Sequence, residues 1–303
     1  MWTKPKLSTL FICFSLLIVF LLFGFPFQNL RGYIFEKIYA QTRITITADE
    51  IYPALFGWPG IGMKNVDVTL PVGTRTLDLS CKKLVFKVGL AGLFPPSPSI
   101  SLYLKNLKQG GDLFIKVGQG KTRIDSDVEA NDIVLDQLAL SGLTETLTGS
   151  LNLTAELALQ TVDLAKSTGE IDIGIEKLKI PAQNFQGFFV LPAMNLASLK
   201  SKINIRNGIA EISSFNFGDK GSDLQGSLSG EVRLGKEVMQ SLLNVTLRLE
   251  LSESYRTHPQ AESLLSLLNS FQTSPGRYAM KWSSSFQDMS ANFVNAIPQK
   301  VEY

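Results

Sequence analysis

Residues 147–159 read LTGSLNLTAELAL, and an apolar side chain stands at almost every second position of this stretch. Successive side chains of a β-strand point to opposite faces of a sheet, so the pattern predicts a strand with one apolar and one polar face. Strands with one face in water belong to antiparallel sheets, whereas the parallel sheets of nucleotide-binding folds bury both faces. The stretch therefore predicts an antiparallel β-protein.

The same period of two extends from this stretch toward both ends of the chain. It recurs in residues 42–48, 66–70, 100–104, 113–117, 171–175 and 243–251. Helices are few: residues 259–271 (PQAESLLSLLNSF) form the best candidate, and residues 132–140 and 192–199 suit short helices or turns. The chain is therefore predicted to be mostly β, with an elongated antiparallel sheet that forms either a curved groove or a sandwich.

A weak internal repeat connects two of the predicted strands. Leu147-x-Gly-Ser-Leu151 recurs as Leu224-x-Gly-Ser-Leu228, and each copy opens a long alternating stretch. A sheet of repeated strand units grows by addition and keeps its apolar side chains on one continuous surface. The candidate residues of this surface are Leu147, Leu151, Leu153, Leu157, Leu224, Leu228, Val232, Leu247 and Leu249.

The N-terminus carries a long apolar stretch, residues 7–27 (LSTLFICFSLLIVFLLFGFPF). These 21 residues hold no charge, and a helix of this length spans the roughly 30 Å of a bilayer's hydrocarbon core. A secretory signal has a shorter apolar core and an early cleavage site, so a retained anchor is predicted, with a cleaved signal as the alternative. The anchor residues include Leu7, Phe11, Leu16, Phe20 and Phe25.

The charges around the anchor predict its orientation. Lys4 and Lys6 precede it, and positive charge on the short side of an anchor favours keeping that side in the cytoplasm. In a bacterial inner membrane, a single-pass anchor would then place the rest of the chain in the periplasm. The predicted organisation is a tip, anchor and juxtamembrane segment in residues 1–40 and a β-rich domain in residues 41–303, with the repeat suggesting halves at 41–140 and 141–303.

The composition argues against several classes of function. The 29 Lys and Arg residues and 27 Asp and Glu residues are interspersed, so no basic patch for nucleic acid is predicted. The one histidine, His258, precedes Pro259 and is predicted to be a helix N-cap or an exposed loop residue. Cys81 is predicted to be a small buried apolar residue.

A group of acidic residues is the nearest approach to a metal site. Asp125, Asp127, Glu129 and Asp132 lie close together in the sequence, but they lack the glycine and the terminal glutamate of a calcium loop. Solvation of one strand face is the simpler interpretation. No catalytic, cofactor-binding or metal-binding residue is predicted, and the protein is not expected to be an enzyme.

Residues 224–234 (LQGSLSGEVRL) and 242–255 (LLNVTLRLELSESY), behind a single anchor and serial strands, resemble the N component of type II secretion systems, the GspN family. That family is similar in turn to the AsmA-like group of periplasmic β-rich proteins anchored in the inner membrane. The resemblance covers nearly the whole chain. It implies a structural role in assembly, through contacts with other type II secretion components, and brings no catalytic residues with it.

Two functions are compatible with these features. A scaffold subunit could add a partner's strand to an open edge of the sheet. Alternatively, a lipid-binding or lipid-transfer protein could hold the acyl chains of a phospholipid against an apolar groove.

Overall fold

The computed structural model describes residues 27–54, 60–72, 75–89, 99–108, 110–137, 147–185, 189–287 and 298–301. These residues form one open sheet of 15 strands and a separate ribbon of two strands. The predicted β-rich antiparallel fold is confirmed, and of the two predicted arrangements the sheet is not a sandwich.

The strands of the large sheet are β1 (Thr45–Ala54), β2 (Gly60–Val72), β3 (Arg75–Gly89), β4 (Ser99–Leu107), β5 (Asp112–Gln119), β6 (Arg123–Val134), β7 (Thr148–Gln160), β8 (Thr168–Ile180), β11 (Met194–Arg206), β12 (Ile209–Phe217), β13 (Leu224–Arg233), β14 (Leu242–Leu251), β15 (Gln272–Ser274) and β16 (Arg277–Ser285), with β17 (Gln299–Lys300) beside β16. The small ribbon is β9 (Gln183–Phe185) and β10 (Phe189–Leu191). The α-helices are α2 (Arg31–Thr42), α3 (Glu253–Arg256) and α4 (Glu262–Leu268). The 3-10 turns are η1 (Phe27–Leu30), η2 (Leu135–Gln137), η3 (Leu164–Lys166), η4 (Val238–Gln240), η5 (Pro259–Ala261) and η6 (Asn269–Phe271).

The strands lie in the sheet almost in the order of the chain. Each strand from β1 to β8 is hydrogen-bonded to the next, and the series continues through β11, β12, β13 and β14 to β16 and β15. Every pair is antiparallel. Two departures from this order occur among the described strands: the β9–β10 ribbon lies between β8 and β11 in the chain, and β15 follows β14 in the chain but pairs with β16. The sheet is continuous across the predicted boundary at residue 140, because β6 pairs with β7.

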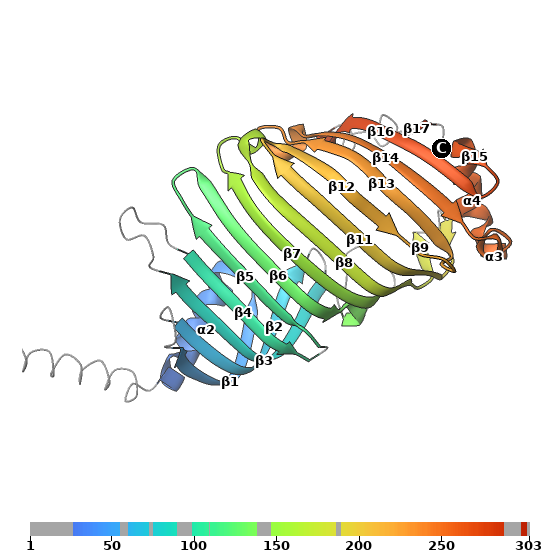
Figure 1. Cartoon of the computed structure of the whole chain (residues 1–303). Helices are drawn as coiled ribbons and strands as arrows, with labels where there is room; N and C mark the ends of the chain where they lie inside the picture. Colours follow the sequence, from blue (N-terminus) through green and yellow to red (C-terminus); the bar gives the residue numbers. More distant parts are fainter. Residues whose placement is uncertain are drawn as a thin grey trace, which may run out of the picture.

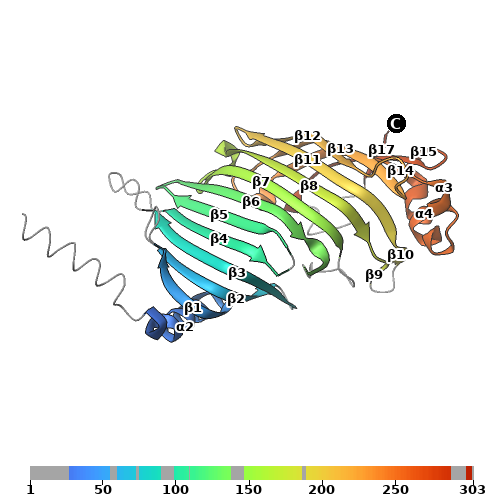
Figure 2. The ribbon, with the colours of Figure 1, turned by 60° about the horizontal axis from the view of Figure 1, so that its bottom comes forward.

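The α-helices lie at the two ends of the sheet (Figures 1 and 2). At one end η1 and α2 contact β1, and at the other α4 contacts β10. The predicted helix at residues 259–271 is present as three successive pieces, η5, α4 and η6. The prediction of a short helix or turn at residues 192–199 is wrong, because β11 begins at Met194.

Each end of the sheet has its own apolar cluster. The N-terminal cluster consists of Ala48, Ile51, Met63, Val66, Val68, Cys81, Leu84, Leu104, Leu107, Ala130 and Ile133. The C-terminal cluster consists of Leu135, Leu178, Met194, Leu196, Phe217, Leu249, Leu251, Tyr255, Ala261, Tyr278 and Met280. Leu151 of β7 packs against both, so the two cores meet at the middle of the sheet.

A row of irregular positions crosses the strands from β2 to β11, and we call it the bulge row. Its left-handed residues, with φ between 48° and 55°, are Asn65, Asn106, Asp132, Lys177 and Ala197. At each position the side-chain alternation gains one residue: Lys64 and Asn65, for example, separate Met63 from Val66. Extra residues of this kind bend a strand and increase its twist. All members of the N-terminal cluster except Val68 flank such a pair of polar residues, so this core forms where the strands change direction.

Residues 7–26 of the predicted membrane anchor, including Leu7, Phe11, Leu16, Phe20 and Phe25, lie outside the described residues. Within the described part of the chain, no helix has both the length and the apolar character needed to cross a bilayer.

Candidate functional site: the apolar face of the sheet

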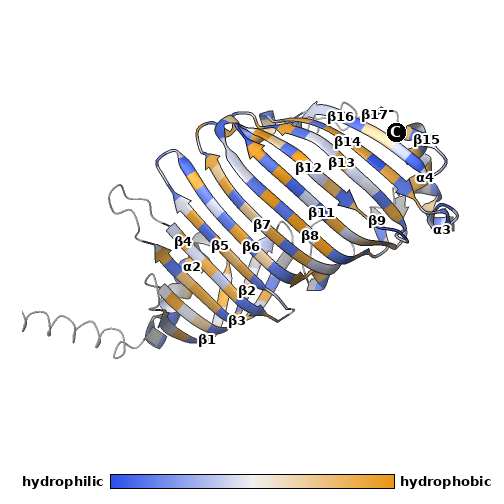
Figure 3. Ribbon diagram, in the orientation of Figure 1, coloured by the Kyte–Doolittle hydropathy of each residue, from blue (hydrophilic) through white to orange (hydrophobic). Residues whose placement is uncertain are grey.

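The strand register brings the alternating apolar residues onto one face of the sheet, which we call the apolar face. A line of facing residues illustrates it: Val128 of β6 lies opposite Ala155, Ala155 opposite Ile171, and Ile171 opposite Ile203. Similar lines run from β1, where Ala48 faces Val66, to β14 and β16, where Leu247 faces Met280. Figure 3 shows apolar and polar residues alternating along the strands. The apolar face is therefore continuous across the whole sheet.

The nine residues predicted for this surface lie on it but in different surroundings. Leu147, Leu151, Leu153, Leu224 and Leu247 pack against the two clusters, and Leu249 belongs to the C-terminal cluster. Leu157, Leu228 and Val232 belong to neither cluster and are half-buried.

The central part of the apolar face is open in the described structure. We define this open stretch as the half-buried residues outside both clusters: Ile115, Val128, Leu157, Leu159, Ile171, Ile173, Ile203, Ile212, Leu228 and Val232. They come from strands β5 to β13, whereas the α-helices contact mainly β1 and β10. The side chains of the open stretch are half-buried, so they stay partly in contact with water.

The C-terminal end of the apolar face is covered. Leu264, Leu265 and Leu268 of α4 pack against the C-terminal cluster. Tyr255 of α3 is 4% exposed, and its hydroxyl donates a 3.4 Å hydrogen bond to the Pro192 carbonyl oxygen. Burial raises the pKa of Tyr255 to about 12. These contacts hold the helices firmly at this end of the sheet.

The N-terminal end is covered by the helical segment that follows the predicted anchor. Phe35 of α2 packs against the N-terminal cluster, and the Gln28 side chain of η1 donates a 3.5 Å hydrogen bond to the Ile51 carbonyl oxygen. The apolar face thus begins beside this segment.

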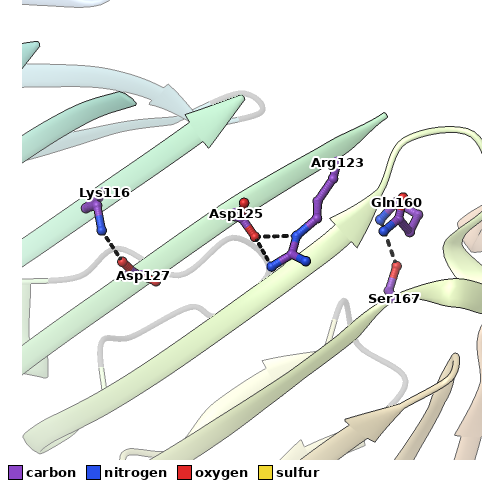
Figure 4. Close-up of polar contacts among 6 residues, drawn as sticks. All are labelled: Lys116, Arg123, Asp125, Asp127, Gln160 and Ser167. Carbon is purple, nitrogen blue, oxygen red and sulfur yellow. Dashed lines mark hydrogen bonds and ion pairs between the residues drawn. The ribbon is translucent and has the colours of Figure 1, made fainter. Parts of the chain in front are cut away.

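The opposite face of the sheet is polar and carries ion pairs (Figure 4). Lys116 Nζ lies 2.9 Å from Asp127 Oδ2, and Arg123 Nη2 lies 2.5 Å from Asp125 Oδ1. The hydrogen bond to Asp127 raises the pKa of Lys116. Most of the acidic group singled out in the sequence, Asp125, Asp127 and Glu129, lies on this solvated face. The described residues contain no group of three or more His, Cys, Asp or Glu side chains placed to hold a metal ion.

Cys81 and His258, the two residues whose side chains could act in catalysis, have structural roles instead. Cys81 is 4% exposed within the N-terminal cluster, as predicted, and burial raises the pKa of its thiol to about 11. His258 is the N-cap of η5, also as predicted, because its Nδ1 accepts a 3.2 Å hydrogen bond from the backbone N–H of Gln260. A thiol that stays protonated and an imidazole engaged in a cap are poor candidates for catalysis.

The bulge row was not predicted from the sequence, although a signal for it exists. Two polar residues separate flanking apolar ones in Ala48-Asp-Glu-Ile51, Met63-Lys-Asn-Val66, Cys81-Lys-Lys-Leu84, Leu104-Lys-Asn-Leu107, Ala130-Asn-Asp-Ile133 and Ile175-Glu-Lys-Leu178. A spacing of three inside a pattern of period two marks an extra residue. Because this spacing recurs in six strands, it could have been used to predict where the strands bend.

The open stretch is suited to binding aliphatic groups. At the paired positions from β6 to β14, the apolar face carries only two polar side chains, Ser126 and Ser201. It therefore offers apolar contact area without the converging polar groups that fix the orientation of a polar ligand.

In comparisons with known proteins, no family model, no curated protein and no solved structure matches the chain.

Proposed function

We propose that the protein binds lipid and that the acyl chains lie along the apolar face. The observation that carries the proposal is the open stretch, a series of half-buried aliphatic side chains that lie among smaller buried residues such as Ala155 and Ser201. Leaving apolar surface in water costs about 25 cal/mol per Å². Contiguous apolar patches of more than a few hundred Å² mark binding sites in soluble proteins. An aliphatic ligand would remove this cost.

The dimensions of the apolar face favour acyl chains as the ligand. The path from β1 to β16 contains 13 strands, which at about 4.8 Å per strand gives a face roughly 60 Å long. An acyl chain spans about half of the ~30 Å hydrocarbon core of a bilayer, or roughly 15 Å. The face is therefore long enough for several chains in succession, which suits a protein that shields lipid along a path.

Neighbouring residues on opposite faces of β13 provide a matched test. Leu228 lies on the open stretch, and Ser229 points to the polar face opposite Thr246. The full chain would be extracted from native membranes in mild detergent, and bound phospholipid would be measured by mass spectrometry for the wild type, Leu228→Asp and Ser229→Asp.

We expect Leu228→Asp to lose bound lipid about tenfold, since a loss of 1.4 kcal/mol in binding free energy already has this effect. A carboxylate against acyl chains loses its hydration without a partner. Ser229→Asp should retain wild-type lipid. Equal lipid in both variants, or wild-type protein that carries none, would contradict the proposal.

A role in type II secretion, with an inner-membrane anchor and a periplasmic domain, stays a prediction from the sequence resemblance. Affinity purification of the C-terminally tagged full chain from its own membranes tests it. Recovery of type II secretion components would support an assembly role beside lipid binding, and their absence would leave lipid binding as the better-supported function.

A further inference from the structure

Exposed apolar side chains gather along one edge of the sheet. Among the described residues, ten large apolar side chains are exposed, and five of them lie at the same ends of the strands. We call these five the apolar rim: Val162 (72% exposed), Ile209 (40%), Val238 (61%), Met239 (44%) and Leu242 (52%). They lie in or beside the β7–β8, β11–β12 and β13–β14 connections, at the upper edge of the sheet in Figure 1.

The three connections form one continuous surface. The Leu164 N–H donates to the Lys236 carbonyl oxygen at 3.4 Å, which joins the β7–β8 connection to the β13–β14 connection. Between them, the Gly208 N–H donates to the Ser167 carbonyl oxygen at 3.0 Å, and the Leu234 N–H donates to the Gly208 carbonyl oxygen at 2.7 Å. The apolar rim is therefore one patch built from three hairpins.

The two longer connections are stiff and built alike. In one, the Ser167 hydroxyl accepts a hydrogen bond from the Gln160 N–H, and in the other the Ser241 hydroxyl accepts one from the Gly235 N–H, both at 3.1 Å. Both serines are 0% exposed. Each connection also contains a 3-10 turn, η3 or η4. Loops fixed in this way hold their apolar tips in water instead of folding them inward.

Apolar side chains occupy both sides of this edge. Ile209 and Leu242 lie on either side of Arg233 on the polar face. On the apolar face, the exposed residues Ile100 and Val117 face each other near the same ends of β4 and β5. The edge thus joins the apolar face to the outside of the sheet.

We propose that the apolar rim lies in the interfacial region of a lipid bilayer and is the edge over which acyl chains pass to and from the apolar face. The proposal rests on the lipid-binding function proposed above. Charged side chains stand among the apolar tips: the exposed cations Lys166, Arg206 and Lys236, and the acids Asp163, which pairs with Lys166 at 3.6 Å, and Glu237. Such a mixture of apolar tips and charges, with three cations to two acids, suits the headgroup region of a membrane.

Single-cysteine labelling of the full chain tests this placement. The background is Cys13→Ser, and Cys81 can stay because it is buried with a raised thiol pKa. An environment-sensitive fluorophore would be attached in Val162→Cys and Val238→Cys. The control is Lys220→Cys, an exposed residue in the β12–β13 connection at the opposite ends of the strands. Each protein would be reconstituted in vesicles of equal parts phosphatidylcholine and phosphatidylglycerol.

At positions 162 and 238 we expect a blue shift, quenching by a lipid-attached quencher and protection from iodide, and at position 220 none of these. Iodide quenching equal at all three positions would overturn the proposal. Protection at 162 and 238 that already appears in detergent and rises with protein concentration would also overturn it, because a second copy would then cover the rim.

A second variant separates the rim from lipid binding itself. Val162→Ser, Val238→Ser and Met239→Ser combined should keep the lipid content of the purified protein but slow transfer of fluorescent phospholipid to acceptor vesicles. Leu228→Asp should lose bound lipid. Wild-type transfer by the triple variant would overturn the rim proposal alone, whereas normal lipid content in Leu228→Asp would overturn the proposed function.

Discussion

Side chains beside the bulge row satisfy backbone groups that the strand ladder leaves unpaired. The Asp132 N–H donates to Asn152 Oδ1 at 2.9 Å. The Asn106 N–H donates to Asp112 Oδ1 at 2.7 Å, and the Ala197 N–H donates to Asn195 Oδ1 at 3.1 Å. Asparagine and aspartate also tolerate the left-handed conformation better than most residues. Short polar residues therefore provide three of the five left-handed positions of the bulge row and also the side-chain acceptors beside it.

Removing one of these acceptors should destabilise the sheet modestly. In Asn152→Ala the Asp132 N–H loses its partner, and we expect a loss of about 1 kcal/mol in the free energy of unfolding. Urea denaturation followed by circular dichroism measures it. Asn152→Asp replaces the amide oxygen with a carboxylate oxygen that can still accept this hydrogen bond, so it should stay closer to the wild type. Equal losses in both variants would show that the hydrogen bond does not contribute.

The buried Cys81 thiol should make stability depend on alkaline pH. Its pKa of about 11 in the folded protein exceeds the ordinary value of 9.0, so the folded state holds the proton more tightly than the unfolded state. The resulting stabilisation is complete below pH 9 and falls as the pH rises toward 11, by at most about 3 kcal/mol.

The comparison with Cys81→Ala isolates this contribution. Between pH 9 and 11, unfolding free energies from urea titrations should fall more steeply for the wild type than for the variant. The smaller alanine side chain adds only an offset that does not depend on pH. Parallel curves would contradict the prediction.

At the scale of elements, the β7–β8 and β13–β14 connections extend the internal repeat of the sequence. The repeated Leu-x-Gly-Ser-Leu segments lead into β7 and β13, and each strand is followed by a 3-10 turn closed by a buried serine. Sequence alternation could not reveal this likeness, because the loops share hydrogen-bond geometry and little sequence. The repeating unit is therefore a pair of strands together with the loop that connects them, β7 to β8 in one copy and β13 to β14 in the other.

Equivalent substitutions in the two connections should have equivalent effects. Ser167→Ala leaves the Gln160 N–H without its acceptor, and Ser241→Ala does the same to the Gly235 N–H. We expect each to cost about 1 kcal/mol, the usual net contribution of one hydrogen bond, because the donors Gln160 and Gly235 are half-buried. Differential scanning calorimetry of both variants checks this. A loss in only one of them would mean that the connections are not alike in function.

Strand positions could be predicted from the sequence, whereas the arrangement of the strands could not. The alternation in residues 147–159 places Leu151, Leu153 and Leu157 on one face in a groove and in a sandwich alike, because both arrangements need one apolar face per strand. Near residue 192, a proline suggested a helix or turn, but β11 begins at Met194, where pairing with β8 outweighs local preference. The covering of the apolar face could not be predicted, because it depends on contacts between residues distant in sequence. Phe35 packs on the N-terminal cluster, and Leu264 packs on the C-terminal cluster.

For the molecule as a whole, the two apolar clusters and the open stretch between them imply that the strands differ in their stability against local opening. Strands β3 and β16 contribute buried residues to the clusters, whereas β5 and β13 contain no buried residue. Local opening of a strand costs less where few side chains are buried.

Hydrogen exchange measured by mass spectrometry should show this difference. We expect amides of β5 and β13 to exchange faster than those of β3 and β16, and added phospholipid to slow exchange chiefly in β5 and β13. Uniform protection along the sheet, or protection by lipid confined to its ends, would contradict the arrangement described here.

Pairing in chain order gives the protein an adjustable length. Because each strand is bonded mainly to the strands just before and after it in the chain, a hairpin can be gained or lost without rearranging the rest. One hairpin adds two strands, or about 10 Å. Duplication or deletion of short gene segments would change the reach of the molecule in steps of this size, so related chains of different span can arise without inventing a new architecture.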